Sequence, residues 1–341
     1  MNIFKFEKNM RDTMADDYEQ AKQGNIDAMF RLGKSFQAQR FFEPAIEWLS
    51  KAAQLGHHEA ALHIADLFVN QQKLNDAAKW IEKVQDDNTL LAKEVIGKYF
   101  FLQGENEKAE QYLLDAWKNG SREAALLLGK MYEQQGQTNE AITWYEKGLK
   151  ENVAGSIPHL IRLLKQMNFE EMVDTWIDWI IKNMELDHLK QVIHVLSELK
   201  DRDRVIYCLK EAARMEDPEA FASLGMIAFG EGQMEEAIKY LENAIENGLE
   251  EARVNLGVVL IETGKKEEGL EELEKAAKMG NAEAMFNLGL YLVDQSPFTA
   301  LKWLEEALEG GIEEAFDIIE KLRSEMEKAY QKKDKKSEQN F

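Results

Sequence analysis

Three histidines, His57, His58 and His63, are the residues whose type and spacing come closest to a metal site. A protein zinc site needs three or four converging ligands, usually Cys or His at characteristic spacings. No cysteine lies near this group in the sequence, and the chain contains no HExxH motif. The sequence therefore predicts no metal site and no cofactor.

Other residue types that catalyse reactions also lack a recognisable arrangement. The sequence shows no Ser–His–Asp set, no glycine-rich phosphate loop and no isolated pair of catalytic carboxylates. Its many Glu–Glu pairs, such as Glu235–Glu236 and Glu271–Glu272, are typical of solvated helix faces. We therefore predict no catalytic residues and a protein that is not an enzyme.

The composition limits the compartment. Only 4 of the 341 residues are proline, which suits a long run of helices, and a single cysteine excludes a disulfide framework. The first residues, MNIFKFEKNMRDTM, lack the apolar core of a signal peptide, and no stretch approaches 18 uninterrupted apolar residues. We expect a cytoplasmic protein that does not enter the membrane.

The charge limits the partners. The formal net charge is −21, and most of the excess acidic residues fall within residues 217–341. Such a surface repels phosphate backbones, so we expect no nucleic-acid partner. A basic protein or peptide could dock there; alternatively, the glutamate-rich faces serve only to keep the chain in solution.

The elements that must position any functional residue follow from a repeat of 32 residues. The stretch KAAQLGHHEAALHIADLF begins at Lys51, and KAAKMGNAEAMFNLGLYL begins at Lys275. Small residues recur at this step throughout most of the chain: Ala28, Ala60, Ala92, Ala124, Ala220, Ala252 and Ala284. Five positions after them comes glycine or alanine: Gly33, Ala65, Gly97, Gly129, Gly225, Gly257 and Gly289.

Each unit predicts two short helices joined by turns. Glycine inside a helix costs about 1 kcal/mol relative to alanine, so its recurrence at one phase indicates a close approach of two helices. We expect it to pack against the small residue 12 positions later, such as Ala45 or Ala237, in the second helix. Because neither helix buries its apolar face alone, stacked units must supply the core. The predicted fold is all-α: an α-solenoid of about nine helix-turn-helix repeats.

Aromatic residues recur at the same step on the second helix. One position of the 32-residue repeat, or phase, carries four tryptophans: Trp48, Trp80, Trp144 and Trp176. This recurrence favours packing between repeats over a ligand site. Cys208 occupies this phase too, so we interpret it as a buried structural thiol. Two further residues of the phase are Tyr112 and Glu272, and the sequence does not explain the glutamate.

The spacing Leu128–Gly129…Tyr132…Ala141 resembles a tetratricopeptide repeat, and the junction KAA-x2-G-x3-A-x3-LG from Lys275 to Gly289 resembles the Sel1-like repeat more closely. The resemblance covers about residues 16–330 and departs from both families, because the period is shorter than the 34 residues of the former and the longer loop of the latter is missing. It implies a right-handed superhelix whose first helices line a concave face that binds partners.

The repeats predict the following organisation. Residues 1–24 form an N-terminal segment and capping helix, 25–152 repeats 1–4, 153–216 divergent repeats 5–6, 217–311 acidic repeats 7–9, 312–332 a C-terminal capping helix and 333–341 a disordered tail. In the divergent repeats, Ile161 and Ile193 replace the glycine, and branched side chains there should push the paired helices apart. This segment is either a hinge or contact zone, or the product of drift without consequence.

Mapped onto the resemblance, the concave face is apolar in repeats 7–9 and partly basic in repeats 5–6. The candidate partner-binding residues are Met226, Phe229, Val254, Val258, Ile261, Phe286, Leu290, Val293, Arg162, Lys165, Lys190 and His194. The carboxylates Glu219, Glu251, Glu262, Glu283 and Asp294 would form an acidic rim. This face suits a protein or peptide, basic or amphipathic; alternatively, its side chains are buried against each other.

The leading hypothesis is a non-enzymatic scaffold or adaptor that binds a protein partner along this face. The alternative is an intracellular peptide receptor that regulates a partner, and an enzyme or enzyme subunit comes third. The sequence leaves a homo-oligomer open.

Overall fold

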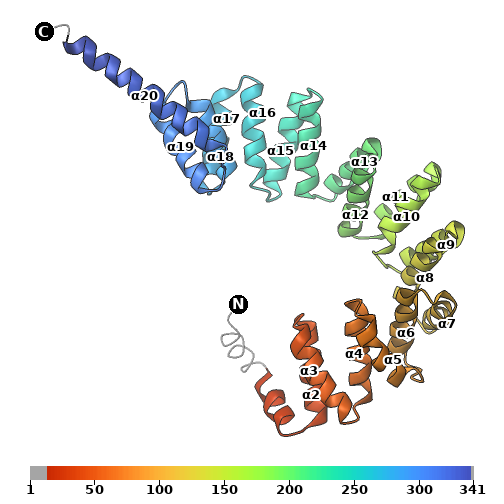
Figure 1. Cartoon of the computed structure of the whole chain (residues 1–341). Coiled ribbons are helices and arrows are strands. Elements are labelled where there is room, and N and C mark those ends of the chain that lie inside the picture. Colours follow the sequence, from red (N-terminus) through yellow and green to blue (C-terminus); the bar gives the residue numbers. More distant parts are fainter. Residues whose placement is uncertain (1–13, 339–341) are drawn as a thin grey trace. The chain divides into compact units, whose positions relative to one another are not determined.

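A computed structural model of the chain describes residues 14–338, and every regular element in that range is an α-helix (Figure 1). Successive helices pack side by side in pairs, one pair for each 32-residue unit. The prediction of an all-α solenoid of about nine helix pairs is confirmed. We call the first helix of each pair helix A and the second helix B.

The chain divides into two compact units, residues 1–174 and 175–341. In the first unit, residues 14–22 form a helix that precedes the pairs. The pairs are α2 (Ile26–Ala38) with α3 (Phe42–Gln54), α4 (His58–Asn70) with α5 (Leu74–Val84), α6 (Leu90–Gln103) with α7 (Asn106–Lys118), α8 (Glu123–Gln134) with α9 (Thr138–Lys150), and α10 (Ser156–Gln166) with the start of α11 (Glu170–Asn183).

The second unit contains the end of α11 and the remaining pairs. These are α12 (Leu186–Glu198) with α13 (Arg202–Arg214), α14 (Pro218–Gly230) with α15 (Met234–Glu246), α16 (Ala252–Glu262) with α17 (Lys266–Lys278), and α18 (Ala282–Leu292) with α19 (Pro297–Glu309). The final helix, α20 (Ala315–Glu338), packs beside α19 and continues beyond residue 332, where the sequence placed its end. Residues 1–13 of the predicted N-terminal segment and 339–341 of the predicted tail lie outside the described residues.

The A helices begin at capping residues that recur at the 32-residue step. Asn25, Ser121, Asp217 and Asn281 each accept a hydrogen bond from the backbone N–H three residues later, at 2.9–3.2 Å. A side-chain cap satisfies one of the four N–H groups that a helix start leaves without a partner. The residue that donates is the small residue of the repeat, such as Ala28 or Ala220, so its phase marks the first turn of helix A.

The helices end at residues in the left-handed conformation, and these recur about every 16 positions. Glycine occupies many of these sites, as at Gly56 with φ 96° and Gly248 with φ 97°. At others, such as Arg40 and Lys200, a side chain adopts φ near 60°. Where it is present, the left-handed residue stops the helix and turns the chain back, so the 16-residue step sets the lengths of helices A and B; α5 and α18 end without such a residue.

The glycine inside helix A brings the two helices of a pair into contact. A Cβ atom built on Gly225 would lie 2.8 Å from Leu241 Cγ and 3.3 Å from the carbonyl oxygen of Ala237. The predicted contact with the small residue of helix B is therefore present at its backbone. The nearer neighbour, however, is Leu241, 16 residues after the glycine, and the pattern of small residues did not point to it. Its side chain fills the space that a Cβ would take.

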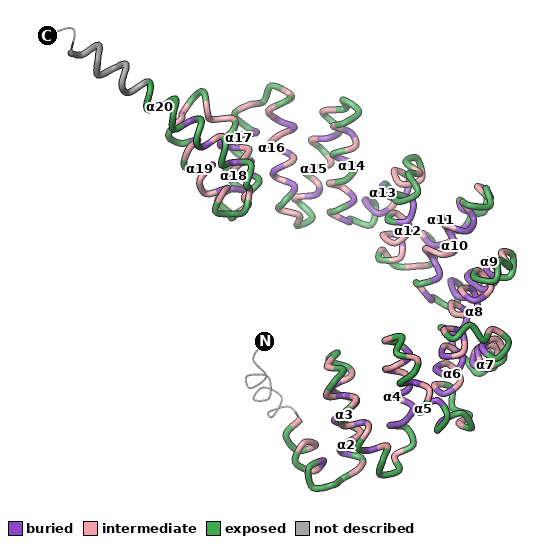
Figure 2. The backbone as a smooth tube through the Cα atoms, in the orientation of Figure 1, coloured by how far each residue is buried: buried purple, intermediate pink, exposed green. Residues whose placement is uncertain are grey.

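Buried residues line the contacts between neighbouring helices (Figure 2), and they form successive apolar clusters along each unit. Trp80, Trp144 and Trp176 are buried, as packing between repeats requires. In the divergent pair α12–α13, Ile193 replaces the glycine, and these two helices contact each other less extensively than every pair that has glycine there. The difference has the direction expected from a branched side chain at this contact, and the larger separation itself stays a prediction.

Candidate partner-binding surface

Nine apolar residues lie at equivalent positions on three neighbouring A helices of the second unit. Along each of α14, α16 and α18 they are spaced i, i+4 and i+7, with Val293 directly after the last residue of α18, and this spacing places them on one helix face. Contacts join α14 to α16 and α16 to α18. We call the set the apolar A-helix patch: Ala222, Met226, Phe229, Val254, Val258, Ile261, Phe286, Leu290 and Val293. Ala222 was not among the predicted residues, although the 32-residue step from Val254 points to it.

The patch is partly open to solvent. Met226 is 40% exposed and Leu290 is 41% exposed, whereas Phe229, Val258, Ile261, Phe286 and Val293 are half-buried. Val254 differs from the rest, because it is 4% exposed and belongs to the core around Leu273. The residues at the middle position of α14 and α18 therefore offer the most accessible apolar surface.

Carboxylates flank the patch at both ends of the A helices. Glu219, Glu251 and Glu283 lie at the helix starts, Glu262 and Asp294 lie at the helix ends, and all five are exposed. Of these five carboxylates, only Glu219 has an ion-pair partner within 4.0 Å among the described residues, and that partner is Lys190. The patch thus lies between two rows of carboxylates, most of which are not neutralised within the chain.

Lys190 and His194, both predicted, line a polar cavity of about 300 Å³ between α12 and α14. Lys190 Nζ donates to Asp217 and to Glu219, each at 2.9 Å. These hydrogen bonds raise the pKa of Lys190 above its ordinary value. Asp217, the cap of α14, is itself buried. Because two carboxylates hold the one ammonium, the cavity is not the basic surface that the sequence predicted.

Arg162 and Lys165, the other predicted basic residues, belong to α10 of the first unit and are half-buried. Lys165 Nζ lies 2.9 Å from Glu170 Oε2, so its charge is also paired. Both residues belong to the first unit, whereas the patch lies in the second.

Comparison with known proteins agrees with this architecture. A tetratricopeptide repeat model matches residues 92–156 and 222–283, and a Sel1 repeat model matches residues 26–57 and 282–312. The chain is a Sel1-like and tetratricopeptide-like helical repeat protein. Repeats of these two families generally mediate protein–protein interaction and are typically non-enzymatic.

Three solved structures are similar to this repeat protein at 19% identity. A Sel1 repeat protein from Oxalobacter formigenes aligns over 91% of each chain with a TM-score of 0.38. A protective antigen of uropathogenic Escherichia coli with an SLR fold aligns over 89% of this chain and 73% of that one, with a TM-score of 0.40. PilF of Pseudomonas aeruginosa aligns over 57% of this chain and 93% of its own, with a TM-score of 0.43. A search of curated protein sequences gives no match.

The three histidines at the second repeat serve different structural roles. His57 Nδ1 accepts from the backbone N–H of Ala60 at the start of α4, and His58 Nε2 lies 3.3 Å from Asp87. His63 is half-buried, and burial lowers its pKa below the ordinary value. Within residues 14–338, no group of three or more His, Cys, Asp or Glu side chains is arranged to hold a metal ion.

Two residues at the aromatic phase of helix B also have structural roles. Cys208 is buried, and burial raises the pKa of its thiol to about 12. Glu272, which the sequence could not explain, accepts from Arg253 Nη1 at 2.6 Å and from Lys275 Nζ at 2.8 Å. Arg253 stands where other A helices carry residues such as Ala125 or Met285, so an ion pair has replaced an apolar contact between the helices.

The helices of the described range give no sign of a membrane span, since none is both long enough and apolar enough to cross a bilayer.

Proposed function

We propose that this repeat protein is a non-enzymatic scaffold that binds a protein partner through the apolar A-helix patch. The observation that carries the proposal is the arrangement of that patch, in which apolar side chains on α14, α16 and α18 lie between two rows of exposed carboxylates. Apolar surface bordered by polar residues is typical of a protein-binding site.

The charges define the partner segment. Glu251, Glu262, Glu283 and Asp294 have no ion-pair partner in the described part of the chain, so a ligand that brings Lys or Arg to them neutralises charge that is otherwise uncompensated. The partner segment is therefore amphipathic, with apolar residues over the patch and basic residues on both sides of them. A nucleic acid is disfavoured by the net charge of −21.

The most accessible side chains provide the strongest test. Completing the burial of Met226 and Leu290 stabilises a complex by about 1 kcal/mol each, since full burial of such a side chain is worth about 1.5–3 kcal/mol and roughly 40% of each is still exposed. Replacing either residue with glutamate removes this gain and leaves a carboxylate to be desolvated in the complex. Because both residues face solvent, these substitutions leave the fold intact.

The experiment uses a synthetic helical peptide of leucine and lysine, with the lysines on both sides of the leucine face, and measures its binding by fluorescence anisotropy. We expect the wild-type protein to bind it, more weakly at high salt, and Met226→Glu with Leu290→Glu to weaken binding by more than tenfold. The matched control is Met279→Glu, because Met279 is 61% exposed but lies outside the patch. Equal loss in the control, or none in the patch variant, would refute the proposal.

A receptor for short peptides is the second candidate, and the polar cavity at Lys190 favours it. That cavity adjoins α14, which also carries Met226. Mass spectrometry of the protein purified under native conditions separates the two functions: a co-purifying short peptide supports the receptor, and a stoichiometric protein that the patch variant no longer captures supports the scaffold.

A further inference from the structure

We infer that the two ends of the helix array are complementary in helix type but are kept from stacking on a second copy of the chain by a pair of like charges, Asp17 and Glu320. Within residues 14–338 the array begins with the single helix 14–22, at the repeat position of a B helix, and ends with α20, at the repeat position of an A helix. Together, α20 of one copy and helix 14–22 of another have the elements of one further A–B pair.

The interior pairs show what such a contact requires. In helix B, the residue at the repeat position of Leu49 is buried and apolar in all nine repeats, through Leu304 in α19. Where helix A carries glycine, this residue packs against that glycine. Its partner in helix A is the residue at the repeat position of the glycine, which we call the glycine phase. A Cβ atom on Gly33 would lie 2.6 Å from Leu49 Cγ, and one on Gly289 would lie 2.6 Å from Leu304 Cγ. No charged residue occupies either phase inside the array.

At the amino-terminal end, the phase of Leu49 is occupied by Asp17. Asp17 Oδ1 accepts from Arg31 Nε at 2.9 Å, so the carboxylate is held in an ion pair of its own unit. Three residues later Gln20 stands at the phase of Ala52, where the nine B helices carry only buried residues without charge or polar side chain. The pairing face of this helix is therefore polar.

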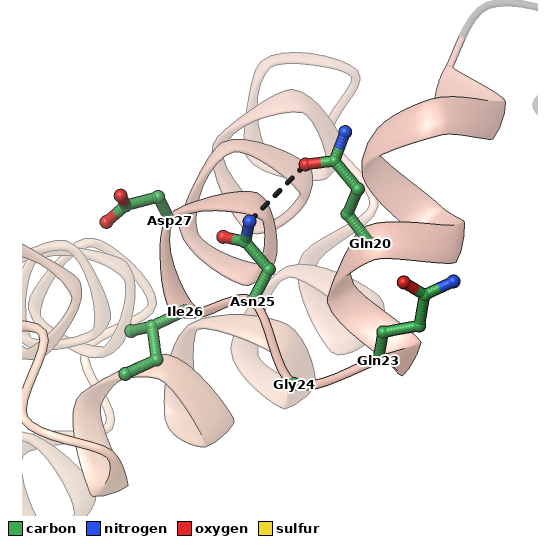
Figure 3. Close-up of a pocket in the computed structure, with 6 residues that line it drawn as sticks. All are labelled: Gln20, Gln23, Gly24, Asn25, Ile26 and Asp27. Carbon is green, nitrogen blue, oxygen red and sulfur yellow. Dashed lines mark hydrogen bonds between the residues drawn. The ribbon is translucent and has the colours of Figure 1, made fainter.

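The shape of this end is also open. The turn that follows helix 14–22 lines a cavity of about 670 Å³, bordered by polar side chains including Gln20, Gln23 and Asn25 (Figure 3). The equivalent turn inside the array, at Gly280, borders a cavity of about 220 Å³ that is also lined by Glu250 and Glu251 near the start of α16. The turn at this end is therefore lined mainly by polar side chains and does not offer an apolar surface to another helix.

At the carboxyl-terminal end, the glycine phase of α20 is occupied by Glu320. Three residues later the exposed Arg323 stands at the phase of Phe36, which is apolar in every A helix from α2 to α18. Arg323 donates to Glu305 at 2.7 Å and to Glu320 at 3.4 Å. Both ends thus carry charges, paired within their own unit, at the positions that drive pairing elsewhere.

Stacking of two copies end to end would place Asp17 directly against Glu320, at the closest contact of the pair. Like charges at a contact of this kind oppose association, and they lose their ion-pair partners and hydration as well. Terminal repeats of solenoids need polar outer faces to stay in solution. Here the polar residues oppose one particular contact, because Asp17 lies on the B-type end and Glu320 on the A-type end, which are the two helices that would otherwise pair.

The experiment restores the interior pattern at one end at a time. The first variant is Asp17→Leu with Gln20→Ala, and the second is Glu320→Gly with Arg323→Leu. Size-exclusion chromatography with light scattering measures the mass of each alone and of an equimolar mixture. We expect wild type and each variant alone to remain at the chain mass of 39.3 kDa, and the mixture to form a heterodimer of twice that mass.

Matched controls are Lys22→Leu mixed with Glu325→Gly, which change exposed residues of the same two helices at phases that do not form the pair contact. We expect this mixture to stay at the single-chain mass. A mixture of the restored variants that does not associate, or associates no more than the control mixture, overturns the inference. The inference is also overturned if the wild-type protein itself associates end to end and Asp17→Lys changes the extent of that association.

Discussion

The glycine of helix A supports a prediction that two substitutions in α14 have opposite signs. Gly225 lies at the contact with α15, where an added Cβ would be 2.8 Å from Leu241 Cγ and 3.1 Å from Leu241 Cδ2. Gly230, the last residue of the same helix, has no atom within 4 Å of that position. Gly225→Ala and Gly230→Ala therefore make the same chemical change in one helix with different surroundings.

The magnitudes follow from two opposing effects. Alanine is favoured over glycine in a helix by about 1 kcal/mol, and overpacking a filled contact costs about 1–3 kcal/mol. For Gly225→Ala the sum is a net loss of about 1 kcal/mol in the free energy of unfolding. For Gly230→Ala, where nothing is overpacked, we expect a gain of up to about 1 kcal/mol.

A double-mutant cycle identifies the atoms responsible. Leu241→Ala removes Cγ and both Cδ atoms, which include the two atoms nearest to the new methyl group, while the Ala237 carbonyl oxygen stays 3.3 Å from it. Leu241→Ala alone costs about 2–5 kcal/mol, because it leaves a cavity. In that background Gly225→Ala no longer destabilises, and the coupling energy between the two sites is about 1–3 kcal/mol.

Urea unfolding followed by far-UV circular dichroism measures these free energies, with the slope of the transition checked in each variant because repeat arrays can lose cooperativity. If Gly225→Ala stabilised the protein as Gly230→Ala does, the glycine phase would not be a close contact. Zero coupling with Leu241 would refute the assignment of the contact to that side chain.

Three further predictions concern stability and pH. Ser156 is fully buried, and its hydroxyl has no hydrogen-bond partner among the described residues, so Ser156→Ala is expected to raise the free energy of unfolding by about 1 kcal/mol; an unchanged urea midpoint would contradict this. Burial raises the pKa of Glu272, but hydrogen bonds from Lys275 and Arg253 outweigh it and hold the pKa below its ordinary value of 4.5. The stability that this carboxylate contributes is therefore fully present above pH 4.5 and is lost as the pH falls through its folded-state pKa; urea midpoints from pH 7 to pH 3 should fall less steeply in Glu272→Gln than in wild type, and parallel curves would count against the ion pair. Burial, assisted by the nearby charge of Lys34, lowers the pKa of His63 from its ordinary value of 6.5, so the unfolded chain takes up a proton there before the folded chain does. Stability is then lost as the pH falls below 6.5, and His63→Leu should flatten the dependence between pH 7 and pH 5; an unaltered slope would assign it to other groups.

The local architecture could be predicted from the sequence because the same 32-residue unit occurs about nine times. A glycine or alanine at one phase and turn residues at another specify helix lengths and pairing through contacts that span 16 residues, as between Gly225 and Leu241. The sequence also contains the signal for the helix caps, since a short polar residue recurs three positions before the alanine: Asn25, Ser121, Asp217 and Asn281.

Accessibility and ion pairing depended on the tertiary structure. Val258 and Leu290 share a repeat position, yet the first is half-buried and the second is 41% exposed, because exposure depends on the neighbouring helices rather than on the repeat. The sequence predicted that Lys190 is a free basic residue. In the structure its ammonium group pairs with Asp217 and Glu219, which lie nearly 30 positions away in the sequence. A repeat period determines which residues are equivalent, whereas the side chains that reach each equivalent position come from adjacent repeats and differ from one to the next.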